Sequence, residues 1–280
     1  MTRQVSIGCD FVHQSRFNVS TVFQVEPLRD QPAELVEENW AMDPPGPSRT
    51  YADLYGNPCR RLTIPAGRSQ ISYRATLRVP DAVEDADEDA PELLPDQLPD
   101  EVLIYTLPSR YCLPDVLGGE AWSRFGAMAP GYRRVQAICD YVNNHLKFSY
   151  GASNSRTTAA DVHESGYGVC RDFTHLAVSL CRALNIPARY VFGYLPEIEV
   201  PPLGTPMDFA AWMEVYLGDR WWTFDPRNNE RRKGRVLIGR GRDAGDVAMA
   251  TTFGAPFLES MLVIAAEANE PSVGPALTGA

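Results

Sequence analysis

The chain has 280 residues, of which 44% are hydrophobic and 22% are charged, a composition typical of a globular protein with room for two domains. The formal net charge of −10 argues against a nucleic-acid-binding groove, because phosphate binding needs clustered Lys and Arg. No segment reaches the roughly 18 continuous apolar residues of a membrane span. We therefore expect neither nucleic acid nor a membrane as a partner.

The beginning of the chain and its cysteines bear on the cellular compartment. The first residues, MTRQVSIGCDFVHQ, contain no long apolar stretch, so we expect no signal peptide. Six cysteines are spread along the chain without a CxxC pair. Without an export signal, we expect them to be reduced thiols in the cytoplasm.

Residues 1–112 contain short segments rich in Val, Ile, Thr and Tyr, separated by Pro, Gly, Asp and Asn. This pattern is typical of strands joined by turns. It predicts an antiparallel β-domain, most simply a β-sandwich. The expected strands lie within residues 3–14, 18–28, 59–67, 69–80 and 101–108.

An acidic segment, residues 81–100, carries nine acids and no base. Such a run repels itself and buries little apolar surface. We expect a solvated, poorly ordered loop, with an acidic docking segment as the alternative.

Residues 113–265 have a different pattern, in which helices precede strands. Apolar residues recur at helical spacing over 130–146 and again from Cys170 to Leu184. Expected strands follow at 188–195, 208–217 and 220–226. The pattern predicts a second, α+β domain, followed by a flexible tail at residues 266–280.

Cys170 lies in the first turn of the second predicted helix, bordering its apolar stripe. Gly166 and Gly168 allow the preceding loop to turn sharply into that helix. A helix N-terminus stabilises a thiolate, so we expect a lowered thiol pKa. The alternative is a buried cysteine that acts only as a small hydrophobe.

Residues 166–194, GYGVCRDFTHLAVSLCRALNIPARYVFGY, resemble the nucleophile segment of the bacterial transglutaminase-like family, which is also labelled as cysteine proteases. Residues 207–226, MDFAAWMEVYLGDRWWTFDP, and 234–254, GRVLIGRGRDAGDVAMATTFG, resemble the following strands and the C-terminal signature of the family. The resemblance implies a β-sandwich accessory domain followed by a papain-type α+β domain. It also implies a Cys-His-Asp site that acts on amide or acyl carbonyls of a peptide or protein substrate.

The family pattern maps the nucleophile onto Cys170 and the aspartate onto Asp225, while the histidine position is Ala210. A two-residue hairpin at Gly218-Asp219 would put Ala210 diagonal to Asp225 on one face of the sheet. An imidazole at position 210 could then bridge the aspartate and the thiol. The alternative role for Asp225 is a strand-end residue that caps a turn.

The four histidines of the chain do not clearly replace the missing one. We expect structural or surface roles for His13, His145 and His175, and only a remote chance of a site role for His163 in the loop before Cys170. These residues do not match a zinc pattern. We therefore expect neither a metal nor another cofactor.

Two functions remain open at this point. The first is a cysteine hydrolase or acyl transferase that forms a Cys170 thioester, with the Cys170 N–H as an oxyanion donor. The second is a catalytically impaired homologue, by natural or deliberate loss of the histidine, that binds a peptide in a cleft walled by Trp212, Tyr216 and Trp221. The alternative role of the two tryptophans is packing against the β-domain. Redox chemistry is a weaker third reading, because no resolving cysteine lies nearby in sequence. The sequence leaves the substrate, the reaction type and the oligomeric state undetermined.

Overall fold

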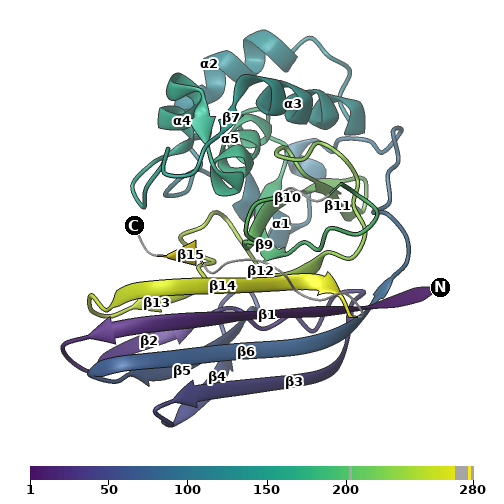
Figure 1. The fold of residues 1–280 in the computed structure, drawn as a ribbon. Helices are drawn as coiled ribbons and strands as arrows, with labels where there is room; N and C mark the ends of the chain where they lie inside the picture. The colour runs from purple at the N-terminus through teal and green to yellow at the C-terminus, as the bar shows by residue number, and fades with distance from the viewer. Residues whose placement is uncertain (202–203, 269–276, 279–280) are drawn as a thin grey trace.

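The computed structural model describes residues 1–201, 204–268 and 277–278. A β-rich N-terminal layer lies against a four-stranded sheet, and helices cover the far side of that sheet (Figure 1). This arrangement confirms the predicted α+β class. In the part of the chain described here, no helix is long and apolar enough to cross a membrane.

Two antiparallel sheets form the N-terminal layer. Their strand orders are β15-β14-β1-β6-β3 and β13-β2-β5-β4. Along β6, every second residue from Ser69 to Val79 is buried, which is the period-2 pattern of a strand with one face on a core. The strands from this part of the chain are β1 (Thr2–Ser15), β2 (Val19–Phe23), β3 (Glu34–Asp43), β4 (Ser48–Ala52), β5 (Pro58–Ile64) and β6 (Gly67–Pro80).

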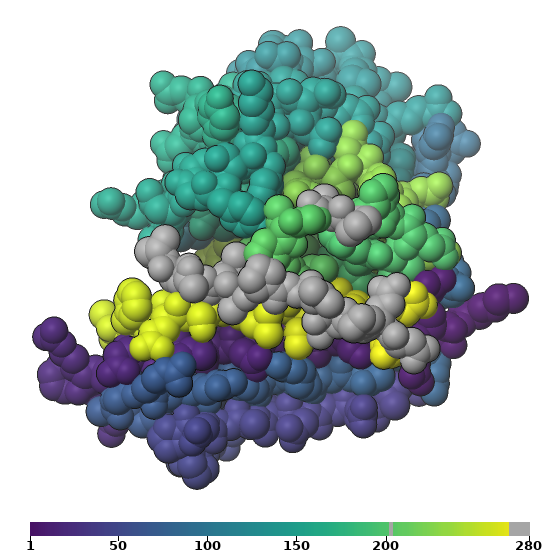
Figure 2. Space-filling model, in the orientation of Figure 1, coloured from purple at the N-terminus to yellow at the C-terminus, as the bar shows by residue number. Residues whose placement is uncertain are grey.

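The C-terminal strands return to the N-terminal layer. β13 (Ala250–Thr252) pairs with β2, and β14 (Phe257–Glu267) pairs with β1 and with β15 (Leu277–Thr278). Figure 2 shows β14, in yellow, lying along the purple N-terminal strands. The division into domains 1–112 and 113–265 stays a prediction, and most of the predicted tail at 266–280 lies outside the described residues.

The α+β part has a four-stranded sheet in the order β11-β10-β9-β12, covered by helices. The helices predicted over 130–146 and 170–184 and the three strands that follow them are present. The strands are β7 (Lys147–Phe148), β8 (Tyr167–Gly168), β9 (Ala188–Tyr194), β10 (Ala210–Leu217), β11 (Arg220–Phe224) and β12 (Val236–Gly241). The helices are α2 (Pro114–Phe125), α3 (Tyr132–His145), α4 (Ala159–Ser165) and α5 (Cys170–Ala183).

Helix α5 is central and buried on nearly all sides, including its polar face. Several of its buried polar groups are hydrogen-bonded to other segments. Arg182 donates to the carbonyl oxygens of Leu107, Ala188 and Arg242 at 2.7–3.0 Å. Ser179 accepts the Leu113 N–H at 3.1 Å. These bonds hold the helix that carries Cys170 in one orientation.

The prediction of a strand over residues 101–108 is wrong. This segment forms the short helix α1 (Asp100–Leu103) and the 3₁₀ turn η2 (Ile104–Thr106), preceded by the 3₁₀ turn η1 (Pro95–Gln97). Val102 and Tyr105 are its buried residues, and their spacing of three fits one helical face. The acids at the start of the helix suit its N-terminus, which outweighs the β-branched composition.

The prediction of a poorly ordered acidic loop at 81–100 is also wrong, because this segment docks on the same chain. Glu84 pairs with Arg235, and Glu92 pairs with the buried Arg134. The carbonyl of Pro91 accepts the Gly218 N–H at 2.7 Å. Glu84 and Glu92 are therefore matched to arginines of the α+β part, which offsets part of the mutual repulsion of the segment.

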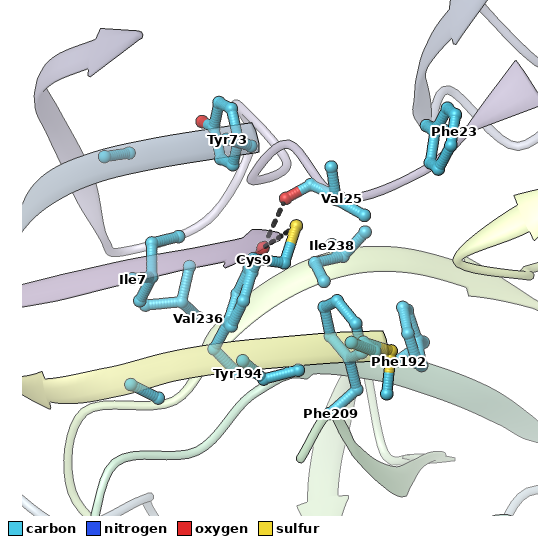
Figure 3. Close-up of a cluster of buried hydrophobic side chains, with 14 of the residues drawn as sticks. Ile7, Cys9, Phe23, Val25, Tyr73, Phe192, Tyr194, Phe209, Val236 and Ile238 are labelled. Atoms are coloured by element: carbon cyan, nitrogen blue, oxygen red, sulfur yellow. Dashed lines mark hydrogen bonds between the residues drawn. The ribbon is translucent and has the colours of Figure 1, made fainter. Parts of the chain in front are cut away.

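One apolar core joins the N-terminal layer to the strands β9 and β12. Figure 3 shows Tyr194 of β9 reaching Cys9 and Val25 of the N-terminal layer, with Phe192 and Phe209 beside it. The Tyr194 hydroxyl donates to the Val25 carbonyl at 2.9 Å and lies 3.9 Å from the Cys9 sulfur. The two layers are thus held by shared packing and by a buried hydrogen bond.

Tyr194→Phe is expected to lower the free energy of unfolding by about 1–2 kcal/mol, because it leaves the buried Val25 carbonyl without its partner. Urea unfolding followed by fluorescence measures the loss. Tyr167→Phe, at an exposed position, serves as the control and should change stability by less than about 0.5 kcal/mol. Equal effects of the two substitutions would contradict a structural role for this bond.

Candidate functional site

The loop before Cys170 turns directly into α5. Gly166 ends α4 with a left-handed φ of 74°, a conformation that favours glycine. A Cβ at Gly168 would lie 2.7 Å from the Asp172 Cβ, so only glycine fits there. Asp172 accepts the Val169 N–H at 2.8 Å and thereby caps the helix. Cys170 is consequently the first residue of α5.

Cys170 lines a small cavity of about 80 Å³ between α5, the start of β10 and the segment after β11. The Cys170 thiol donates to the Phe209 carbonyl, with 3.8 Å between sulfur and oxygen. Ala210 lines the same cavity, so the structure brings the nucleophile position and the histidine position together. Among the described residues, the lining comprises Phe148, Tyr150, Cys170, Leu195, Glu197, Thr205, Pro206, Met207, Asp208, Phe209, Ala210, Ala211, Arg227, Asn228 and Arg232.

The expectation of a lowered thiol pKa is wrong. Burial raises the pKa of Cys170 to about 12, and the nearby charge of Asp208 adds to the rise. Hydrogen bonds from the Ala211 and Arg171 backbone and the charge of Arg227 act in the opposite direction, but they are smaller effects. The helix N-terminus is therefore outweighed by the desolvation of the thiolate.

Two of the four histidines pack inside the molecule. His175 Nε2 accepts the Ala244 N–H at 3.1 Å, and its ring stacks on Tyr111 at 5.1 Å between centroids. Burial lowers the pKa of His175 to about 3. His13 lies in β1 with its ring centroid 6.3 Å from that of Phe23, and burial lowers its pKa as well.

The other two histidines lie side by side on α3 and α4. His145 Nε2 lies 2.8 Å from the His163 carbonyl oxygen, and His163 Nε2 lies 3.0 Å from the Tyr141 hydroxyl. Glu120 approaches His163 at 3.5 Å. None of the four histidines is among the described residues that line the Cys170 cavity.

Asp225 lies directly after β11, and its carboxylate accepts hydrogen bonds from residues that follow it in the sequence. Its Oδ1 accepts the backbone N–H groups of Arg227 and Asn228 at 3.1 and 2.9 Å, which is the geometry of a turn cap. Its Oδ2 accepts from the Asn228 side chain and from Arg235, each at 2.7 Å.

Hydrogen bonds and a nearby charge favour the charged form of the Asp225 carboxyl despite its burial. Burial raises its pKa, but Arg235 and the Asn228 hydrogen bonds outweigh it and leave the pKa below the ordinary value. Asp225 lines a different cavity from Cys170, and Asn228 lies between the two sites. The catalytic assignment of Cys170 and Asp225 stays a prediction.

The hairpin prediction is confirmed in its register. Leu217 pairs with Arg220 and Met213 with Phe224, around a turn in which Gly218 has a φ of 63°. Met213, Leu217 and Phe224 belong to the core under the helices, at positions that share one face of the sheet.

The prediction that Trp212, Tyr216 and Trp221 form the walls of the cleft is wrong. Trp212 is fully buried, in a small cluster with Leu28, and the Arg235 guanidinium lies 4.7 Å from its ring. Trp221 packs edge-on against Tyr216 at 5.3 Å between centroids. None of the three predicted wall residues lines the described part of the Cys170 cavity. Leu28 and Leu237 pack with Trp212, and Trp221 packs against Tyr105.

Four charged residues of the cavity were not predicted: Glu197, Asp208, Arg227 and Arg232. Asp208 precedes Ala210 by two positions, so the two share a face of extended chain. Arg227 follows the Asp-Pro pair at the end of β11, and Arg232 lies in the next loop. Their positions at strand ends beside the histidine position are a signal that could have found them.

Comparisons with known proteins agree with this architecture. A family model described as the transglutaminase-like superfamily matches residues 123–226. A solved structure from Cytophaga hutchinsonii, named as that of a putative cysteine protease, is 31% identical, covers 100% of this chain and 97% of its own, and has a TM-score of 0.86. The likeness thus includes the N-terminal layer as well as the α+β part.

Curated relatives match a shorter part of the chain. An uncharacterized protein of Mycobacterium leprae is 32% identical over 119 residues, which are 41% of this chain and 42% of the relative. One of Mycobacterium tuberculosis is 33% identical over 128 residues, or 40% of each protein. The chain spans about 40% of the length of these relatives. From the family match and the full-length structural likeness together, we conclude that the chain belongs to the papain-like transglutaminase-like superfamily.

Proposed function

We propose that this chain is a catalytically impaired member of its superfamily, whose Cys170 cavity binds a peptide or amide-bearing ligand without efficient turnover. The observation that carries the proposal is Ala210, which occupies the cavity wall where the superfamily pattern has its histidine. Loss of such a base costs on the order of 10⁴ in rate. The raised pKa of the Cys170 thiol supports the same conclusion.

Slow acyl transfer through Cys170 is the second candidate, and a specific feature favours it. The Ala211 and Arg171 backbone groups hydrogen-bond to the thiol and lower its pKa, and they are the type of donor that stabilises a developing negative charge. A cysteine thioester on this fold would serve hydrolysis, deamidation, transglutamination or ligation alike. This candidate requires turnover that depends on Cys170.

A cytoplasmic setting is part of the proposal. All six cysteines are free in the structure, and five of them are buried. Reduced, buried thiols are typical of an intracellular protein. The matched relatives named above come from bacteria, and we infer a bacterial peptide or protein as the partner.

Incubation with a chymotryptic digest of β-casein tests the proposal. We expect no cleaved, deamidated or cross-linked peptide in mass spectra of the mixture, and we expect some peptides to co-elute with the chain in gel filtration. Filling the cavity by Ala210→Phe should abolish co-elution. Ala66→Phe, at an exposed position in the N-terminal layer, is the control for added aromatic surface.

Two results would contradict the proposal. New peptide products that form with the natural chain and disappear in Cys170→Ala would show efficient turnover and favour the second candidate. Absence of both products and co-eluting peptides would contradict the binding role.

A further inference from the structure

The Cys170 cavity is too small for a whole organic ligand. Its volume of about 80 Å³ is well below the roughly 300–1,000 Å³ of pockets for drug-sized molecules. A single side chain or a chain end is the unit that fits. The charged residues of the wall therefore decide which kind of group the cavity accepts.

Arg232 is a buried guanidinium in that wall with unused hydrogen-bonding capacity. The residue is 6% exposed, and its Nε has no hydrogen-bond partner among the described groups. Its Nη2 donates to the Pro196 carbonyl at 3.2 Å, and its Nη1 lies 3.6 Å from Glu230. A buried, unpaired N–H is costly, so an acceptor that entered the cavity would relieve that cost.

Arg227 supplies a second guanidinium to the same cavity. Its guanidinium lies 4.7 Å from the Phe148 ring centroid, and its Nη1 donates to the Asn228 Oδ1. These two contacts of the side chain are with a ring and a neutral amide. Arg227 and Cys170 line the same cavity, and the charge of Arg227 lowers the pKa of the thiol.

Two acids line the cavity as well, but both already interact with other groups of the chain. The Asp208 Oδ1 accepts the Phe209 N–H at 2.7 Å, and burial raises the pKa of Asp208, so its charged form is disfavoured there. Glu197 makes an interaction of its own, and its charge favours the charged form of Arg232. Planar guanidinium groups match a carboxylate in geometry and charge.

We propose that Arg227 and Arg232 form a carboxylate-binding subsite, so that the ligand of the Cys170 cavity carries a carboxylate close to the group it presents to Cys170. This inference rests on the proposed function, because it names the ligand class of the same cavity. The carboxylate is either an acidic side chain or a free C-terminus.

Paired alkylation with iodoacetate and iodoacetamide tests the subsite. Both reagents lose iodide to the same thiolate, so the ratio of their rates at Cys170 does not depend on the thiol pKa. N-acetylcysteine amide, mixed into the sample, gives the reference ratio. At pH 9 we expect the ratio at Cys170, measured by peptide mass spectrometry, to exceed the reference on the order of tenfold.

Three variants assign the effect to the two arginines. Arg227→Gln and Arg232→Gln should each reduce the ratio several-fold, while thermal unfolding confirms that the variants are folded. Arg231→Gln removes the same charge at an exposed position that lines the other cavity, and it should leave the ratio unchanged. A ratio equal to the reference, or equal effects of all three variants, would overturn the subsite even if the proposed function holds.

Protection of Cys170 from iodoacetamide distinguishes the two sources of carboxylate. Acetyl-Ala-Glu-Ala amide supplies an acidic side chain, acetyl-tri-Ala supplies a free C-terminus, and acetyl-tri-Ala amide is the neutral control. Stronger protection by either of the first two peptides than by the control identifies the source. Equal protection by all three would overturn the proposal.

Discussion

Ala210→His is expected to accelerate alkylation of Cys170 at pH 7 on the order of a hundredfold. An imidazole at this position of the cavity wall would stabilise the thiolate as an ion pair. If the thiol pKa falls from about 12 toward the ordinary value of about 8.5, the thiolate fraction rises by more than three orders of magnitude. The lower nucleophilicity of a less basic thiolate cancels roughly half of that gain on a logarithmic scale.

Ala210→Phe is the matched control for this substitution, since it adds a ring of similar size without a proton acceptor. Its alkylation rate should not exceed that of the natural chain. The buried cysteines, such as Cys139 and Cys181, serve as internal references in the same digest. If Cys170 is alkylated at the same rate in Ala210→His and Ala210→Phe, the missing imidazole does not explain the low reactivity of the thiol.

Arg235→Leu is expected to lower the free energy of unfolding by about 3–5 kcal/mol, because it leaves a buried charge without its partner. The Arg235 and Asp225 side chains are 5% and 2% exposed and lie 2.7 Å apart. Arg235 also pairs with Glu84 of the acidic segment. Arg133→Leu breaks an ion pair with Glu88 of the same segment, but both side chains are about 70% exposed. Its effect should be below about 1 kcal/mol.

The pH dependence of the Arg235→Leu effect separates the ion pair from simple packing. The folded-state pKa of Asp225 is below its ordinary value, so its stabilising effect is present above about pH 4 and lost as the pH falls through the lowered pKa. In the variant, uncompensated burial should raise that pKa, so that acid favours the folded form. The stability difference measured by urea unfolding should therefore shrink between pH 7 and pH 4. A difference independent of pH would contradict the charge-based account.

The predictable part of the fold rested on local pattern. The alternation along β10 and β11 and the turn residues Gly218 and Asp219 were sufficient for the register of the hairpin. The apolar period that starts at Cys170, together with Gly168 before it, likewise predicted where α5 begins. These features depend on neighbours in the sequence, which is why they could be derived from it.

The unpredicted part depends on contacts between distant segments. The acidic run at 81–100 was judged by its own composition, whereas its order comes from arginines more than forty residues away, such as Arg134 and Arg235. Trp212 was expected in a cleft, but Leu28 of the N-terminal layer covers it. The thiol pKa of Cys170 was judged from its helix terminus alone, although burial has the larger effect.

The central claim is that Cys170 is a protonated thiol of low reactivity in a binding cavity. The rate of its alkylation by iodoacetamide between pH 5 and 10 tests this claim most directly. Peptide mass spectrometry resolves Cys170 from the other five cysteines in the natural chain. We predict a rate that is very low at pH 7 and still rising at pH 10, as expected for a thiol whose pKa lies far above the ordinary value. A rate that reaches its plateau below about pH 7 would show a poised thiolate and contradict the account.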